Sequence, residues 1–589
     1  MRVSEKADRS RLIQAAMQEI PCDLTIQNVK LVNVITGEIY PASVDILDGH
    51  IVRVREEGQE TTQPSREVYD GHGAYLMPGF IDAHMHVEST MMIPENFARA
   101  VVPWGTTTVC TDPHEIGNVC GIPGVKFMLE SGRQTALRHL VLAPSCVPSV
   151  PGLESTGASF GAKEIAELLD TDDVVGIAEI MDYVGVYKDA PRMHSIIDEG
   201  IKRGMFLQGH APRATGKELA AYRIGGPVSD HESASAEEVN EKLRMGIHVN
   251  LRASSIVDNL GELVKGISKH TVYDFVSVCT DDVHAKYLLE HGHINAVVGK
   301  MIGYGISPVN AVKMATLNAA REYGFDDLGA IAPGYLADLQ LVDEIDGRRP
   351  NAVFIRGKLA ADHGRYVAVD PAPKHYDFPN TVNMEQLQGP DDFRLKAPEG
   401  CGNTVKTIVM NQSARGGIVM ESTYEDLPVV DGCVSIKGHD DLQFVCVANR
   451  YGTGTKSIVV YRGFGLTHGA LATTVSHDSH NFTVIYKEPE DAWVAAKTLK
   501  ECGGGMCAVE DGRLMYTLKL PVAGLMSPLP CDQIAKEIEN MENTMFKLCP
   551  NKFSILMVAI LALPVRPGTI ITDMGIVDGL SQKFMEQFR

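Results

Sequence analysis

The chain has 589 residues, of which 44% are hydrophobic and 22% are charged. This length exceeds what one core usually organises, and the composition excludes a disordered or fibrous protein. The net charge of -21 would repel phosphate backbones and anionic lipid, so we expect no nucleic-acid partner and no membrane partner. The sequence therefore indicates a globular protein of two or three domains.

Residues 1–77 predict the first part of a small β domain. LTIQNVKLVNV, ASVDILDGHIVRV and AYLMPG are short β-type runs separated by Gly and Asp turns. Similar runs, AIAPGYLADLQLVD from Ala330 and NAVFIRGKLA, return at the start of residues 331–399. We expect this return segment to complete one split β-sandwich domain, with a linker, around an inserted larger domain.

Residues 78–330 predict the inserted domain, in which strand, loop and helix alternate. Alternating strands and helices imply a parallel sheet, and eight such units imply a closed (β/α)8 TIM-like barrel. Helical stretches such as AKEIAELLD and SAEEVNEKLRMG separate the strands. The eight strand-like runs are FIDAHMH, TTTVCTDPHE, HLVLAPSCVP, VVGIAEIMDY, MFLQGHAP, GPVSDHES, IHVNLRASS and FVSVCTDD.

Residues 400–589 predict an extra C-terminal α/β domain. The β-type runs TIVMNQ, SIVVYRGF and NFTVIYKE alternate with the helical runs EDAWVAAKTLKECG and CDQIAKEIENMENTM. A barrel usually folds without such an appendage. The segment SHDSHN, with His477, Asp478 and His480, could close over the barrel mouth or hold an extra metal ion. A satisfied turn is an equal alternative for this segment.

The twelve cysteines are scattered, and no two form a C-x-x-C pair, which disfavours a zinc ribbon and a thioredoxin-like site. Several lie in apolar runs, as Cys110 and Cys446 do, and this is typical of buried free thiols. The charged N-terminus MRVSEKADRSRL lacks the apolar stretch of a signal peptide. We therefore expect a cytoplasmic protein, since free thiols suit a reducing compartment.

A set of metal-ligand residue types lies at the ends of the predicted barrel strands. His84 and His86 end the first strand two positions apart, so both imidazoles can reach one ion. Strand ends of this kind face the catalytic mouth of a barrel. Four imidazoles and two carboxylates form a ligand set that suits Zn, Mn or Fe. If these were unrelated polar loop residues, residue type and strand-end position would have to agree by chance six times. The other four residues are Glu179, His210, His231 and Asp281.

PGFIDAHMHVE, GHAP, DHES and CTDD resemble the metal-binding signatures of the amidohydrolase superfamily, and SPVNAVKMATLNAAREYGFDDLGAIAPGYLADLQLVD resembles its exit from the barrel. Within it, the chain is most similar to the adenine deaminase family, through HMHVESTMM, CTDPHEIGNV, SCVPSVPG, GIAEIMDY and YRGFGLTHGALATTVSHDSHN. The resemblance covers essentially the whole chain, including a C-terminal domain that most amidohydrolases lack. It implies hydrolytic deamination of adenine to hypoxanthine and ammonia in purine salvage. We expect two divalent metal ions, Mn foremost and otherwise Fe or Zn, and a homo-oligomer with a dimer favoured.

Two details favour a two-metal mechanism. Many binuclear relatives bridge their ions with a carboxylated lysine at the fourth strand, where Glu179 is here the expected bridge. Single-metal deaminases place a Glu three residues after the fifth-strand His, a position that is Arg213 in this chain. Because metal coordination lowers the pKa of water from 15.7 to about 7, we expect a hydroxide bridging both ions to be the nucleophile.

The predicted catalytic residues are Asp281, Glu179 and His231. Asp281 is expected to ligate an ion, accept a proton and relay it to the departing amine. His231 is expected to bind an ion and to polarise the ring or the leaving group. For two of the candidates that could read the purine edge, His114 and Glu115, a structural hydrogen bond is an equal alternative. The candidates are Asp112, His114, Glu115, Ser145, Cys146 and Asp182.

Other functions remain open because one barrel hosts many reactions. The main alternative is another amidohydrolase that acts on a cyclic amide or on an N-acetyl small molecule. The C-terminal domain and the segment TDPHEIGNV favour the deaminase. A non-catalytic scaffold is disfavoured, because scaffolds lose ligands and all six ligand residues are present.

Overall fold

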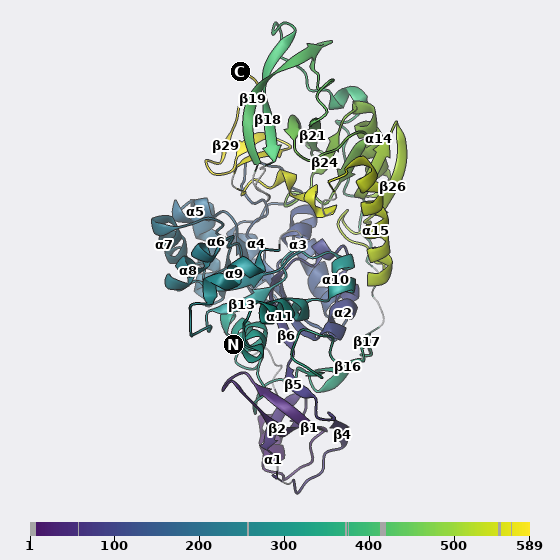
Figure 1. The fold of residues 1–589 in the computed structure, drawn as a ribbon. Coiled ribbons are helices and arrows are strands. Elements are labelled where there is room, and N and C mark those ends of the chain that lie inside the picture. The colour runs from purple at the N-terminus through teal and green to yellow at the C-terminus, as the bar shows by residue number, and fades with distance from the viewer. Residues whose placement is uncertain are drawn as a thin grey trace.

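The structure is a computed structural model. It places a small β unit at one end of the molecule, a barrel in the centre and a C-terminal unit at the other end (Figure 1). The first six residues of the charged N-terminal segment lie outside the described residues. The structure describes residues 7–56, 58–59, 61–255, 258–371, 374, 376–412, 420–551, 555–566 and 568–589.

The β unit is built from both flanks of the barrel. Strand β5 (Tyr75–Pro78) pairs antiparallel with β14 (Leu339–Val342), which joins the two segments in one sheet. The sheet runs β17-β16-β15-β14-β5-β1-β2-β3, with β4 beside β1, and helix α1 (Arg9–Ala16) precedes it. The split β domain expected from the sequence is thus one continuous sheet. Its other strands are β1 (Leu24–Asn33), β2 (Glu38–Leu47), β3 (His50–Glu56), β4 (Glu67–Asp70), β15 (Ala352–Ile355), β16 (Lys358–Asp362) and β17 (Arg365–Tyr366).

The eight predicted barrel strands are all present and form two parallel arcs, β10-β9-β8-β7-β6 and β11-β12-β13. Val228 N donates to Leu207 O at 3.0 Å and Asp281 N donates to His84 O at 3.0 Å, which links the arcs on both sides. The (β/α)8 fold is therefore confirmed. The strands are β6 (Phe80–Met85), β7 (Thr106–Thr111), β8 (Arg138–Ala143), β9 (Val174–Ile180), β10 (Phe206–Gly209), β11 (Ser229–Asp230), β12 (His248–Arg252) and β13 (Val276–Cys279).

Helices surround these strands and begin and end at recognisable sequence signals. Ser235 caps α8 by accepting from Glu238 N at 3.3 Å, and α6 begins at Pro191 and ends before Gly204, whose φ is +62°. Helix α6, for example, buries Met193, Ile196 and Ile197 and packs against β9 and β10. The helices are α2 (Pro94–Val101), α3 (His114–Gly132), α4 (Ala162–Leu169), α5 (Tyr183–Tyr187), α6 (Pro191–Arg203), α7 (Gly216–Ile224), α8 (Ala236–Arg244), α9 (Leu260–Ile267), α10 (Ala285–His291), α11 (Ile294–Gly303), α12 (Pro308–Lys313) and α13 (Ala319–Glu322), with short turns η1 (Glu88–Thr90), η2 (Val102–Trp104) and η3 (Met314–Asn318).

The C-terminal unit is α/β, as expected. A nine-stranded sheet, ordered β20-β19-β18-β22-β21-β24-β23-β25-β26, is accompanied by α14 (Pro489–Cys502) and α15 (Cys531–Leu548). The small sheet β27-β28-β29 follows. The remaining elements are η4 (Pro390–Phe393), β18 (Thr404–Gln412), β19 (Met420–Val430), β20 (Cys433–Val434), β21 (Leu442–Ala448), β22 (Lys456–Arg462), β23 (Ala470–Thr473), β24 (Phe482–Tyr486), β25 (Gly505–Glu510), β26 (Arg513–Lys519), η5 (Ile555–Met557), η6 (Ala559–Ala562), β27 (Thr569–Thr572), β28 (Gly575–Asp578) and β29 (Lys583–Phe584).

One hydrophobic core crosses the boundary between the barrel and the C-terminal unit. Met91 and Phe97 of the barrel belong to the same buried cluster as Met526 and Ile534 of the C-terminal unit. Burial of this kind is the main favourable term in folding. The C-terminal unit therefore packs together with the barrel in one core, although barrels of this kind usually fold without such an appendage.

All twelve cysteines are free thiols, as the sequence indicated. Seven of them are buried, Cys110 and Cys446 among them, and the other five are partly buried. Among the helices that the structure describes, none combines the length and the apolar character needed to cross a membrane.

Candidate metal centre and active site

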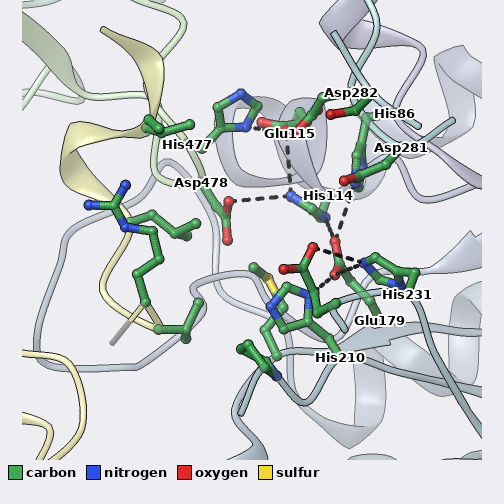
Figure 2. A pocket seen from close by; sticks show the side chains of 18 of the residues that line it. His86, His114, Glu115, Glu179, His210, His231, Asp281, Asp282, His477 and Asp478 are labelled. Atoms are coloured by element: carbon green, nitrogen blue, oxygen red, sulfur yellow. Dashed lines mark hydrogen bonds and ion pairs between the residues drawn. The ribbon is translucent and has the colours of Figure 1, made fainter. Parts of the chain in front are cut away.

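The six predicted metal ligands meet at the carboxyl ends of the barrel strands. His84 lies in β6 and Glu179 in β9, and the other four follow the ends of β6, β10, β11 and β13. All six side chains are buried, with at most 8% of any residue exposed. Figure 2 shows His86, Glu179, His210, His231 and Asp281 directed toward one another.

A first group of ligand atoms surrounds Asp281. Its Oδ1 lies 3.4 Å from His84 Nε2 and 3.3 Å from His86 Nε2. His86 Nε2 also lies 3.4 Å from Glu179 Oε1. Donor atoms held about 2.0–2.1 Å from one tetrahedral ion stand about 3.3 Å apart, so these spacings fit a shared ion.

A second group surrounds the other oxygen of Glu179. Glu179 Oε2 contacts His210 Nδ1 and lies 3.2 Å from His231 Nε2. The two oxygens of Glu179 thus face different groups of imidazoles. This is the arrangement that a carboxylate bridging two ions requires.

The hydrogen bonds of the His84 and His86 ring nitrogens test whether these residues fit a metal ion. His84 Nδ1 pairs with Gln208 Oε1 at 2.9 Å and His86 Nδ1 pairs with the Asp112 carbonyl at 3.0 Å, which leaves each Nε2 free to ligate. His84 Nε2 is buried without a hydrogen-bond partner among the described residues. An orphaned imidazole nitrogen between two carboxylates is costly unless it binds something. The donor set therefore fits divalent metal ions, in agreement with the buried His, Asp and Glu groups of this region.

Arg252 was missed by the sequence analysis, although it closes the predicted seventh strand and could have been noticed there. Its Nη1 donates to Asp281 Oδ2 at 2.7 Å and contacts Glu232. Burial by itself would raise the pKa of Asp281, but the guanidinium holds that pKa well below its usual range. Arg252 thereby keeps Asp281 ionised.

Five of the six ligands, namely His86, Glu179, His210, His231 and Asp281, border a cavity of about 100 Å³ between the barrel and the C-terminal unit. Figure 2 shows the yellow C-terminal segment across this cavity from His231 and Asp281. The barrel contributes His114, Glu115, Glu232, Arg252 and Asp282 in addition to the ligands. The C-terminal unit contributes His477, Asp478, Ile560, Leu563, Val565 and Arg566.

The SHDSHN segment lies between β23 and β24 and docks on the barrel. His477 Nδ1 lies 2.6 Å from Glu115 Oε1, and His480 Nε2 contacts the other oxygen of that carboxylate. Asp478 Oδ2 accepts from Ser149 Oγ at 2.6 Å, and its Oδ1 lies 3.5 Å from His114 Nε2. The segment is thus both a wall of the cavity and a contact between the two units.

Four of the six predicted purine-reading residues lie outside the lining of the cavity. Asp112 binds the backbone and ring of His114, Ser145 Oγ donates to the Glu179 carbonyl at 2.7 Å, and Asp182 caps α5. Cys146 packs in an apolar cluster with Met181 and Val565. His114 and Glu115, in contrast, line the cavity.

The fold and the site define a hydrolase of the amidohydrolase class whose buried ligand set fits divalent metal ions. Residues 75–360 match the profile of the amidohydrolase family, and residues 417–583 match the adenine deaminase C-terminal domain. A solved structure described as an amidohydrolase is 18% identical and covers 58% of this chain and 99% of its own, with a TM-score of 0.43.

Two curated relatives match nearly the entire chain. An adenine deaminase of Moorella thermoacetica is 36% identical over 98% of this chain and 97% of its own length. Adenine deaminase 3 of Rhizobium meliloti is 37% identical over 96% of both chains. The chain belongs to the adenine deaminase family.

Proposed function

We propose that this enzyme hydrolyses adenine to hypoxanthine and ammonia, a reaction of purine salvage. One observation carries the proposal. The metal-ligand cluster at the barrel mouth shares its cavity with residues of the unit that matches the adenine deaminase C-terminal domain. Relatives of nearly full length that are named adenine deaminases support the same substrate.

The proposal includes two divalent metal ions, with Mn foremost and Fe or Zn as alternatives. His84, His86, Asp281 and Glu179 Oε1 would hold one ion, and Glu179 Oε2, His210 and His231 would hold the other. When bound, the ions lower the pKa of water from 15.7 to about 7 and so provide a nucleophile at neutral pH. The two-sided contacts of Glu179 support its role as the bridge.

Asp281 moves the proton in this proposal. Because Arg252 keeps its carboxylate ionised, Asp281 can accept a proton from the attacking water. A C6–O bond then forms, the C6–N bond breaks, and Asp281 returns the proton to the amine, which departs as ammonia. The other water proton stays on the product ring, so adenine and water balance hypoxanthine and ammonia. His231, whose ring stacks on that of His84 with centroids 3.8 Å apart, would polarise the ring or the leaving group.

His114 and Glu115 are the proposed contacts to the purine among the candidates from the sequence. Both are buried and line the cavity. Both are also fixed by neighbours, His114 by Asp112 at 2.9 Å and Glu115 by His477. A fixed donor or acceptor orients a substrate at little entropic cost.

Ammonia release from a panel of purines, pyrimidines and cyclic amides, with enzyme reconstituted with Mn, Fe or Zn, tests this function. We expect turnover of adenine and much poorer turnover of adenosine, because the C-terminal unit closes a cavity of only about 100 Å³. Equal kcat/KM on adenine and adenosine would contradict the proposed closure around a free base. Turnover of cyclic amides or N-acetyl compounds alone would favour the other amidohydrolase reaction.

The proposal also includes a cytoplasmic homo-oligomer, with a dimer favoured. Twelve free thiols suit a reducing compartment. The mass of the purified protein in solution, measured by light scattering, checks the oligomer: twice the chain mass is expected, and the mass of one chain would contradict it.

A further inference from the structure

One arginine in the wall of the cavity, Arg566, is buried without a hydrogen-bond partner for its guanidinium among the residues that the structure describes. Arg566 is 4% exposed, and none of its three guanidinium nitrogens has a hydrogen-bond partner in the described part of the chain. Arg252, the other arginine that lines this cavity, donates to the Asp281 carboxylate at 2.7 Å. Leaving a guanidinium buried and unpaired is strongly unfavourable, so this arrangement calls for a ligand.

The surroundings of Arg566 show where such a ligand would bind. Arg566 lines the same cavity as the metal ligands, next to Leu563 and Val565. Val565 packs against Cys146 and Met181 of the barrel, so the immediate neighbours of Arg566 in the chain form an apolar part of this wall. In Figure 2 the C-terminal segment lies across the cavity from His231 and Asp281. A substrate between the two walls therefore meets the ligands on one side and Arg566 on the other.

We propose that Arg566 binds the N3–N9 edge of adenine, an inference that rests on the proposed function. N3 is the ring atom opposite C6, so a purine with C6 at the metal ligands turns N3 and the neighbouring N9 toward the far wall. N3 and N9 both accept hydrogen bonds when the ring proton is on N7. The planar guanidinium offers two parallel N–H donors, which match two adjacent acceptors.

This role predicts opposite effects on stability and on catalysis. Replacing an unpaired buried charge by an apolar side chain of similar length should stabilise the free enzyme, so Arg566→Met should melt at the same or a higher temperature. The same substitution removes charge-assisted hydrogen bonds to the substrate, which should lower kcat/KM on adenine by about 10- to 100-fold. If the role of Arg566 were purely structural, the substitution would lower the melting temperature and kcat/KM together.

The decisive experiment measures kcat/KM of the metal-loaded, full-length wild type and of Arg566→Met, each on adenine and on 3-deazaadenine. 3-Deazaadenine carries C–H in place of N3, and its intrinsic reactivity is the same in either protein. We expect the loss of kcat/KM from adenine to 3-deazaadenine to be about 10- to 100-fold larger in the wild type than in Arg566→Met. Arg566→Lys, which keeps the charge but not the fork, should give an intermediate value.

Arg450→Met is the matched control, since Arg450 is fully buried in the C-terminal unit and does not line the cavity. The ratio of kcat/KM on adenine to kcat/KM on 3-deazaadenine should be the same in Arg450→Met as in the wild type. An equal loss in wild type and Arg566→Met, or a variant of Arg566 that melts lower and sheds metal, would overturn the inference. A wild type without activity on adenine would instead overturn the proposed function.

Discussion

Asp281 and Asp282 are neighbours with different partners. Strand β13 ends at Cys279 and Asp281 has a φ of +57°, so the alternation of side chains assumed from strand geometry no longer applies here. Asp281 faces His84, His86 and Arg252, whereas Asp282 Oδ1 accepts from Ser89 Oγ at 2.5 Å. Both carboxylates border the cavity, but only Asp281 touches the ligand group.

Asp281→Asn should lower kcat by at least about 10²–10⁴-fold, because the amide keeps one ligating oxygen but does not accept the proton. Asp282→Asn removes a negative charge from nearly the same place and should have a milder effect. Rates and metal content are measured together, since an empty site would mimic a lost base. Near-normal turnover of Asp281→Asn with metal bound, beside an inactive Asp282→Asn, would show that the wrong carboxylate was assigned.

The sequence could reveal the six ligands but not the whole cavity. The ligands combine a residue type with a strand end, and both are visible in the sequence. Arg566 has no such pattern around it; only the packing of residues 560–566 against the barrel brings it to the site. Glu232 and Arg252 stand beside recognisable strand ends, yet their pairing with each other and with Asp281 depends on side-chain directions that spacing does not give.

At the scale of elements, helix α3 of the barrel is tied to the loop between β23 and β24. Glu115 at the start of α3 contacts both His477 and His480. Burial alone would lower the pKa of His477, but the Glu115 carboxylate raises it to about 9. At His480 burial outweighs the same carboxylate and lowers the pKa, so His477 is the charged partner of Glu115.

This ion pair predicts a pH dependence of stability. The pKa of His477 is raised above its ordinary value of 6.5, so its contribution is complete below about pH 6.5 and is lost as the pH rises through about 9. Glu115→Gln should lower the melting temperature at pH 6.5 and should flatten its fall toward pH 9. The melting temperature of both proteins across this range is the measurement. Parallel curves would show that the pair adds no net stability.

A surface pair provides the control for that experiment. Lys126 and Glu167 lie 2.9 Å apart with about half of each side chain exposed. Exposed pairs contribute about 0–1 kcal/mol, so Glu167→Gln should leave the melting curve nearly unchanged at every pH. A large effect of Glu167→Gln would show that the method responds to net charge and not to the buried contact.

At the scale of the whole molecule, the barrel and the C-terminal unit depend on each other. They share the core that contains Met91, Phe97, Met526 and Ile534, and they share the cavity. Removing residues 400–589 should therefore abolish turnover and also leave the barrel insoluble, because it exposes a large apolar surface. Turnover and the soluble fraction of the truncated protein are measured. A soluble, active truncated barrel would contradict this account and restore the idea of an accessory domain.

The fold class was predictable because strand and helix periodicity alternates eight times, and because β-type runs recur on both flanks of the barrel. The contact between units was not predictable by the same means. His477 and Asp478 reach the barrel only through the packing of a loop between β23 and β24, and local patterns do not encode which surfaces meet. The domain limits chosen from the sequence remain predictions.

Titration of the metal-free enzyme with Mn, with ammonia release from adenine as the readout, tests the central claim most directly. Because the two oxygens of Glu179 face separate groups of ligands, activity should rise until two equivalents of metal are bound per chain and then stay constant. Full activity at one equivalent would contradict the bridging role of Glu179, and no ammonia at any metal content would contradict the proposed reaction.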